Sequence, residues 1–325
     1  MSNESKFKNI LQQWEQSERL YHQRKEQTSS DGIIKHRIKR LKKEVINFIY
    51  LRFLPYKKAI KNNTPISQPS EHREHLKPSN KGSQQVLAVV IHAFYFDIFV
   101  RIIEKTGSIS TPYTLYITTH QGIAQEVSSY VKSLGLDAHI EVYENKGRDI
   151  LPFLKIINLI KTNGHQVILK LHTKKSPHKF AKGRSWCDSM VDQLLEETIV
   201  DKAIEIFAAY PTIGLISPHR HLYPLGRKAG SNMVRITELA DKIGYQGNIN
   251  QQWFVGGTMF YARANAFDSL LKLEIKDADF EKEPIPMDGT LAHILERFFG
   301  IAANKEGLDV VDTRFIKSLN EQDIS

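Results

Sequence analysis

The stretch Val142-Tyr-Glu-Asn-Lys-Gly-Arg-Asp-Ile150 decides the fold, together with Val167-Ile-Leu-Lys-Leu-His-Thr-Lys-Lys175, which follows it. Each stretch contains a short apolar run, which is typical of a buried parallel strand. Between them, apolar residues recur at helical spacing over residues 149–160. The sequence therefore predicts a strand–turn–helix–strand unit, the building block of a parallel α/β sheet.

Polar residues gather where the strands of this unit are predicted to end. Gly147 permits a tight turn, Arg148 stands beside a helix N-terminus, and Asp149 is a natural N-cap. The second strand delivers further basic side chains to the same edge: His172, Lys174 and Lys175. Helix N-termini favour anions, and ligands bind at this edge of open α/β sheets. We therefore expect a site for phosphate or carboxylate.

Strand-like and helix-like segments alternate along residues 85–305, which predicts a doubly wound, mostly parallel α/β sheet. The expected strands are 86–95, 113–119, 140–143, 167–171, 213–217 and 254–262, and the expected helices are 97–106, 123–134, 149–160, 186–209 and 289–299. Residues 219–235 combine glycines with basic side chains and are predicted to form a mobile loop. A polar tail with a short strand is expected at 306–325.

The basic charge is confined to the start of the chain of 325 residues. The first 80 residues contain 17 Lys and Arg against 8 Asp and Glu, which equals the whole net charge of +9. Because the remainder is neutral overall, nucleic acid is not an expected partner. We predict a basic helical arm at 1–61 and a linker at 62–84, where Asn, Ser and Pro are frequent.

Residues 33–54 of this arm place apolar side chains on one helical face, with Lys and Arg beside it. This pattern is typical of a helix lying on an anionic membrane, and packing against the folded domain is the alternative. The sequence shows no signal peptide and no apolar run long enough to span a bilayer, and its single cysteine is Cys187. We therefore expect a cytoplasmic protein, peripheral at the inner membrane.

Four blocks resemble the signature of the rhamnan synthesis F family, in the same order over about residues 86–300. They are Glu144-Asn-Lys-Gly-Arg-Asp149, Lys170-Leu-His-Thr-Lys-Lys-Ser-Pro-His178, Gly256-Gly-Thr-Met-Phe260 and Met287-Asp-Gly-Thr-Leu-Ala-His293. This family comprises bacterial glycosyltransferases of surface polysaccharides. The resemblance implies a GT-A-like domain that transfers a deoxyhexose, L-rhamnose from dTDP-rhamnose, to a lipid-linked glycan. A non-catalytic module that binds glycan or nucleotide sugar is the alternative.

A nucleotide-sugar donor needs a platform for its base and cations for its diphosphate. Predicted strand ends and the matched blocks supply both kinds of group. The candidate donor-binding residues are His92, Tyr95, His120, Asn145, Gly147, Arg148, Asp149, His172, Lys174 and Lys175. Tyr95 is equally explained as a core aromatic, and adjacent lysines commonly form a solvated turn.

The diphosphate is predicted to bind without a metal. GT-A enzymes commonly hold a metal with an Asp-x-Asp motif, but the corresponding strand end here is basic, over residues 170–175. Arginine and lysine can supply the positive charge directly. A literal Asp277-Ala-Asp279 lies in an acidic loop far from that strand end, and hard cations need converging oxygens. We therefore expect no cofactor.

Asp288 is the predicted catalytic residue, as the general base of an inverting transfer, because one ionised carboxylate at the head of a late helix can accept a hydroxyl proton. A capping role for Asp288 is compatible with this. The candidate residues for the acceptor or the sugar are His178, Gly256, Gly257 and His293. The alternatives are a strand bulge for the two glycines, a plain loop position for His178 and an indirect role for His293.

Overall fold

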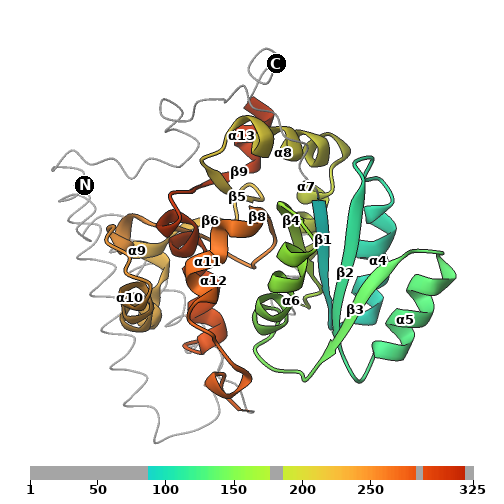
Figure 1. Ribbon diagram of the computed structural model, residues 1–325, viewed down its shortest axis with the longest axis horizontal. Coiled ribbons are helices and arrows are strands. Elements are labelled where there is room, and N and C mark those ends of the chain that lie inside the picture. Colours follow the sequence, from blue (N-terminus) through green and yellow to red (C-terminus); the bar gives the residue numbers. More distant parts are fainter. Residues whose placement is uncertain (1–86, 176–185, 283–287, 319–325) are drawn as a thin grey trace, which may run out of the picture. The chain divides into compact units, whose positions relative to one another are not determined.

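The computed structural model describes residues 87–175, 186–282 and 288–318 (Figure 1). The predicted arm at 1–61, the linker at 62–84 and the candidate residue His178 lie outside the described residues. None of the helices in the described ranges has the length and apolar character needed to cross a bilayer.

A seven-stranded sheet occupies the centre of the described part of the chain, in the order β3-β2-β1-β4-β8-β5-β9 (Figure 1). The strands are β1 (Leu87–Ala93), β2 (Tyr113–His120), β3 (Ala138–Tyr143), β4 (Val167–His172), β5 (Ile213–Ser217), β8 (Phe260–Arg263) and β9 (Asp309–Asp312). All neighbours are parallel except β8, which is antiparallel to both β4 and β5. This confirms the predicted α/β class with a mostly parallel sheet.

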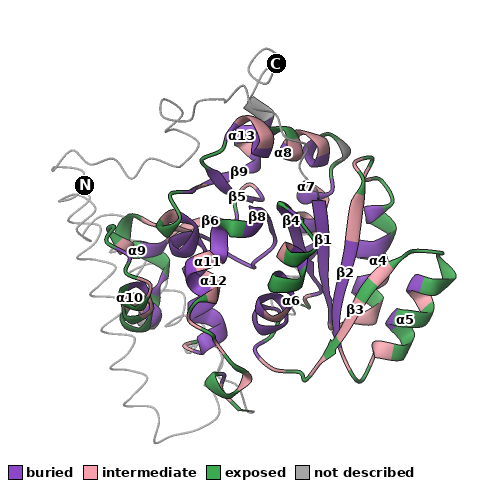
Figure 2. Ribbon diagram, viewed as in Figure 1, coloured by how far each residue is buried: buried purple, intermediate pink, exposed green. Residues whose placement is uncertain are grey.

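Helices cover both faces of the sheet, as expected for a doubly wound fold. One face packs against α4 (Phe96–Thr106), α5 (Ala124–Ser133), α7 (Trp186–Leu194), α8 (Glu197–Ala209) and α13 (Thr313–Ser318). The other packs against α6 (Ile150–Thr162), α10 (Met233–Lys242) and α12 (Leu291–Lys305). Side chains of a strand alternate between the faces, so Val89 joins the first core and Val90 the second. β1 and β4 are buried throughout, whereas the edge strand β3 is partly exposed (Figure 2).

The order of the strands creates a switch point between β1 and β4. The chain leaves β1 through α4 towards β2, and α6 later returns it to β4 on the other side of β1. His92 and His172 are register partners at the ends of these two strands. Ligands of open α/β sheets bind outside the carboxyl ends of the strands at such a point.

The strand predicted at 254–262 is in fact two strands in different sheets. β7 (Trp253–Val255) pairs with β6 (Leu222–Pro224) in a small second sheet, and β8 enters the main sheet. Between them Gly257 has a φ of 91° and Thr258 a φ of 51°. Two consecutive left-handed residues reverse the chain, so one continuous strand is impossible here.

The loop predicted at 219–235 is also wrong, because it contains β6, α9 (Leu225–Lys228), the 3₁₀ turn η4 (Gly230–Asn232) and the start of α10. Leu225, Ala229 and Ile236 are buried in the core and anchor these elements. The predicted helix 186–209 is divided into α7 and α8. The folded domain also extends beyond residue 305, because β9 joins the sheet and α13 follows it. The remaining short elements are η5 (Ile249–Gln251), η6 (Ala264–Phe267), α11 (Asp268–Leu271) and η7 (Asp277–Asp279).

Candidate active site

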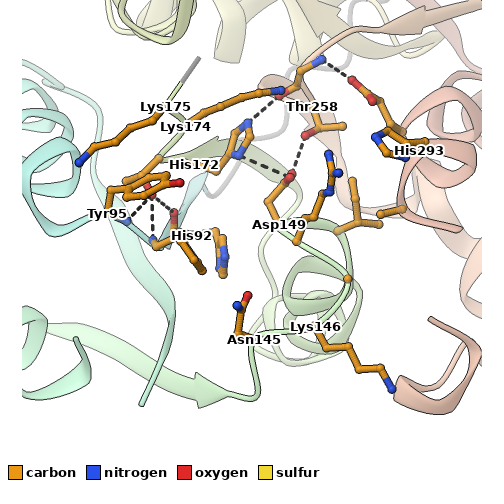
Figure 3. Close-up of a pocket in the computed structure, with 18 residues that line it drawn as sticks. His92, Tyr95, Asn145, Lys146, Asp149, His172, Lys174, Lys175, Thr258 and His293 are labelled. Carbon is orange, nitrogen blue, oxygen red and sulfur yellow. Dashed lines mark hydrogen bonds and ion pairs between the residues drawn. The ribbon is translucent and has the colours of Figure 1, made fainter. Parts of the chain in front are cut away.

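A cleft of about 420 Å³ opens at the carboxyl ends of β1 and β4 (Figure 3). Small-molecule sites are usually ~300–1,000 Å³ in volume. The predicted donor residues that line it are His92, Tyr95, Asn145, Gly147, Arg148, Asp149, His172, Lys174 and Lys175. The predicted acceptor or sugar residues that line it are Gly257 and His293. The fold thus brings together most of the residues singled out from four distant blocks.

Three predicted residues that the structure describes do not line this cleft. They are His120, Gly256 and Asp288. His120 supports the wall from behind, because its Nε2 lies 3.3 Å from the carbonyl oxygen of Phe94 and its ring lies 4.8 Å from the Phe94 ring. Phe94 itself lines the cleft.

A buried ion pair lies at the floor of the cleft. Lys170 Nζ donates to Asp149 Oδ2 at 2.6 Å and to the carbonyl oxygen of Thr258 at 2.9 Å. The Thr258 hydroxyl donates to the same Asp149 oxygen at 2.5 Å. Burial opposes ionisation of Asp149, but His172 and Lys170 outweigh it and hold the carboxyl pKa well below its ordinary value. Asp149 is therefore an anion whose charge is balanced by the buried ammonium of Lys170.

This pairing changes the role expected for Asp149 at the start of α6. Asp149 occupies the N-cap position, but its side chain makes no capping hydrogen bond. Its carboxylate turns to Lys170 instead, because a buried ammonium needs a counter-charge more than a helix end needs a cap. The N–H groups of Ile150 and Leu151 at the start of α6 bond the Gly147 carbonyl oxygen at 3.1 and 3.3 Å, and Pro152 has none. The N-terminus of α6, which faces the cleft, therefore favours an anion through the helix dipole.

Two strained turns face each other across this network. Gly147 and Arg148 have φ values of 65° and 57°, and the turn of Gly257 and Thr258 is likewise left-handed. His172 Nε2 donates to the Gly257 carbonyl oxygen at 2.7 Å, while its Nδ1 lies 3.4 Å from Asp149 Oδ1 (Figure 3). Strained backbone of this kind persists where surrounding contacts enforce it, most often at functional sites.

The histidines of the cleft are neutral near pH 7. Burial lowers the pKa of His92 to about 4 and that of His172 to about 3. Burial and the nearby Arg148 lower the pKa of His293 to about 4. His293 Nδ1 lies 3.4 Å from the backbone N–H of Thr290, from which it accepts, so the proton of the neutral ring is on Nε2. These rings can therefore donate or accept hydrogen bonds without adding charge.

Cations predominate around the rim. The basic residues that line the cleft are Lys146, Arg148, Lys174 and Lys175. Lys174 lies 4.7 Å above the ring of Trp186, and Lys175 pairs with Asp97 at 3.1 Å while lying over Tyr95. Among the described residues, only Asp149 and Glu296 bring carboxylates to the cleft. Since Asp149 is neutralised from below, the cleft is suited to an anionic ligand.

Gly256 and Gly257 pack closely against aromatic side chains on the side of their turn that faces away from the cleft. A Cβ added to Gly256 would lie 2.5 Å from the Tyr223 ring, and one added to Gly257 would lie 2.4 Å from the Trp186 ring. Neither glycine therefore leaves room for a sugar on that side. Gly257 instead presents its peptide to the cleft, where its N–H donates to Glu296 Oε1 at 2.6 Å.

Asp288 lies three residues before α12 and is mostly exposed. The N-cap of α12 is Thr290, so Asp288 does not cap this helix. Its Oδ1 accepts from the Asn232 amide at 3.2 Å and lies 3.6 Å from Arg297. Burial raises its pKa, but hydrogen bonds from Gly289 and Asn232, with Arg297 nearby, outweigh this and keep the pKa low.

The literal Asp-x-Asp does not fit a metal site. Asp277 pairs with Lys155 at 2.6 Å, and Asp279 accepts from the backbone N–H of Lys276. Neither aspartate lines the cleft. Within the described ranges, no group of three or more His, Cys, Asp or Glu side chains is placed to hold a metal ion.

The model of the rhamnan synthesis protein F family matches residues 56–308, which is more than half of this chain and includes all four blocks around the cleft. The chain belongs to the rhamnan synthesis protein F family. The uncharacterized protein WxcX of Xanthomonas campestris pv. campestris, in two strains, is 36% identical over 219 residues, covering 67% of this chain and 31% of the relative. This family member therefore spans about a third of the length of the curated relatives it matches.

Several lining residues were not singled out as site residues from the sequence. Lys146 and Thr258 lie inside the quoted blocks, and the buried Lys170 beneath them does as well. A lysine in the middle of an apolar strand was a usable signal for Lys170, because a buried ammonium requires a partner. Glu296 is not among the site residues predicted from the sequence, because its contact with the Gly257 turn joins residues 39 positions apart.

Proposed function

We propose that this chain is a glycosyltransferase of surface polysaccharide synthesis that takes L-rhamnose from dTDP-rhamnose, within a GT-A-like domain. One observation carries the proposal: a member of the rhamnan synthesis protein F family has a basic cleft at the β1–β4 switch point. A nucleoside diphosphate sugar is an anion with a flat base, and this cleft offers cations beside aromatic rings.

The cleft divides naturally between the parts of such a donor. The diphosphate is proposed to lie against the N-terminus of α6, with Arg148 and Lys174 as its cations. The base is proposed to lie near Phe94 and Tyr95 at the end of β1. Charge develops on the diphosphate as the glycosidic bond breaks, and fixed cations stabilise it without reorganisation.

Transfer is proposed to be inverting and independent of a divalent metal. The chemistry of the strand end supports this, since Lys174 and Lys175 stand where carboxylate ligands would otherwise be needed. We further propose a lipid-linked glycan acceptor and an anionic membrane surface that attracts the basic residues 33–54. Binding of the chain to anionic vesicles should then weaken as salt screens the charges.

The test is turnover of dTDP-L-rhamnose by the purified full chain, followed as release of dTDP in buffer with EDTA. We expect dTDP to appear with EDTA present. Binding of the donor without any release would show a non-catalytic binding module instead. Release that requires Mn²⁺ or Mg²⁺ would overturn the metal-independent part alone.

A further inference from the structure

We propose that Glu296, on the second turn of α12, is the general base that removes the proton of the attacking hydroxyl. The assignment rests on the proposed glycosyl transfer. Glu296 lines the cleft from the same helical face as Ala292 and His293, at spacings of four and three residues. Its carboxylate therefore borders the part of the cleft where donor and acceptor would meet.

The other carboxylate of the cleft is unsuited to this task. Asp149 Oδ2 already accepts from Lys170 at 2.6 Å and from Thr258 at 2.5 Å, and its side chain is 11% exposed. Protonating it would break a buried ion pair and leave the ammonium of Lys170 without its counter-charge. Asp149 consequently stays ionised and positions the two turns.

Glu296 has spare capacity to accept a proton. Its Oε1 accepts from the Gly257 N–H at 2.6 Å, and its Oε2 lies 3.9 Å from the Arg297 guanidinium. An ionised carboxylate has about four acceptor positions, so a substrate hydroxyl can bind beside the Gly257 contact. The side chain is 22% exposed, which leaves it partly shielded yet reachable from the cleft.

The Gly257 peptide holds this carboxylate in place. Its N–H binds Glu296 and its carbonyl oxygen accepts from His172, so the turn is fixed from both sides. The turn cannot slide, because Gly257 packs against Trp186 so closely that a Cβ would lie at 2.4 Å. A base held within hydrogen-bond reach before the substrate arrives is the arrangement that proton transfer requires.

Asp288 is less well placed for the same role. Its side chain is 52% exposed, it does not line the cleft, and its Oδ1 is engaged by Asn232 and approached by Arg297. It balances the charge of Arg297, whose own guanidinium donates to the His293 carbonyl oxygen at 2.8 Å. Asp288 thus supports the start of α12 from outside the cleft.

The proposed step balances without any other reactant. The acceptor oxygen forms a bond to the anomeric carbon while the bond from that carbon to the diphosphate oxygen breaks. The electron pair of the broken bond leaves with the nucleoside diphosphate, and the hydroxyl proton passes to Glu296 Oε2. Glu296 later releases this proton to water, which restores the carboxylate.

The experiment compares Glu296→Gln with Glu205→Gln, an exposed glutamate on α8 at the opposite face of the sheet. Glutamine keeps an oxygen for the Gly257 N–H but cannot take the proton. We expect dTDP release from dTDP-L-rhamnose, with water as acceptor, to fall by about 10²–10⁴-fold while dTDP affinity stays within about twofold. Glu205→Gln should match the wild type in both measurements.

Chemical rescue by formate distinguishes a proton-accepting role of Glu296 from a purely structural one. Glu296→Ala should lose turnover and regain part of it in added formate, whose carboxylate can enter the vacated space. Asp288→Asn is expected to lose less turnover than Glu296→Gln. Wild-type turnover in Glu296→Gln, or a Glu296→Ala variant that formate does not restore, would overturn the assignment. A wild-type chain without dTDP release would overturn the proposed function, and this assignment with it.

Discussion

Asp149 and Lys170 form a pair whose members depend on each other. Lys170 is 1% exposed, and it donates hydrogen bonds to Asp149 and to the Thr258 carbonyl oxygen at the floor of the cleft. Lys170→Met should lower the free energy of unfolding by about 3–5 kcal/mol, because it leaves Asp149 buried and charged without its partner. Urea unfolding gives this number directly.

A double variant of Asp149 and Lys170 tests whether the two residues stabilise the fold as a coupled pair. Asp149→Asn combined with Lys170→Met removes both charges, so its loss should be smaller than the sum of the two single losses. Lys132→Met, on the exposed side of α5, should leave the free energy of unfolding within about 0.5 kcal/mol. Strictly additive losses for the pair would contradict a coupled ion pair.

Arg148 combines a strained backbone with a guanidinium at the mouth of the cleft. Arg148→Ala should weaken donor binding by about 1.5–3 kcal/mol, roughly 10–100-fold, because a charge-assisted hydrogen bond is lost. Arg148→Gly should bind donor as weakly but raise the free energy of unfolding, since glycine adopts a φ of 57° without strain. Calorimetric titration with dTDP and urea unfolding check the two effects separately. Unchanged dTDP affinity in both variants would remove Arg148 from the site.

Helix α6 presents its N-terminus to the cleft only because the turn before it is tight. Gly147 and Gly164 flank α6 and both have positive φ, 65° and 83°. A Cβ at Gly147 would lie 2.5 Å from Leu151 Cβ, whereas one at Gly164 would meet nothing within 4 Å. Gly164→Ala should cost about 1–2 kcal/mol of stability from backbone strain. Gly147→Ala should cost about 1–3 kcal/mol more, from overpacking, and should also weaken dTDP binding.

Equal losses for the two glycine variants in urea unfolding, with dTDP affinity unchanged in both, would contradict this view of the turn. The comparison is matched, because both glycines border the same helix and differ in what surrounds them.

The elements that the sequence predicted well are those with a strong local period. β1, β4 and α6 are buried along most of their length, so their apolar pattern identifies them without knowledge of their neighbours. The break between β7 and β8 depends on Thr258 adopting a left-handed φ, which a β-branched residue does only under tertiary constraint. The α10 region was missed because Gly226, Gly230 and basic side chains suggested a loop, while tertiary packing of Leu225 and Ile236 outweighed them.

The candidate site likewise has a part that the local sequence predicts and a part that depends on tertiary contacts. Strand ends and block matches predicted the donor side, since His92, Arg148 and Lys174 lie at the ends of elements that the sequence identifies. The network beneath it joins residues 88 and 109 positions apart, as in the contacts of Thr258 with Lys170 and Asp149. Local sequence carries no signal for such distances, so this part of the site required the structure.

The molecule as a whole should lose stability in mild acid. His92, His172 and His293 have folded-state pKa values of about 4, 3 and 4, below their ordinary value of 6.5. Between these values the unfolded chain binds more protons than the folded chain. The free energy of unfolding is therefore highest above pH 6.5 and falls as pH decreases towards 3.

Urea unfolding at several pH values checks this dependence. His172→Gln should flatten the fall in stability, because it removes one of the buried groups that must stay neutral. Lys132→Met, at an exposed position on α5 and without a group that titrates in this range, should leave the slope as in the wild type. A wild-type stability that is constant between pH 6.5 and 4 would contradict the burial of neutral histidines.

A crystal structure of the full chain with bound dTDP would test whether the β1–β4 switch point is the donor site of a glycosyltransferase. The account predicts the diphosphate within about 3 Å of the Arg148 guanidinium, at the N-terminus of α6, with thymine beside Tyr95. Density for dTDP elsewhere, such as in a cavity of about 370 Å³ beside Arg235, would contradict it.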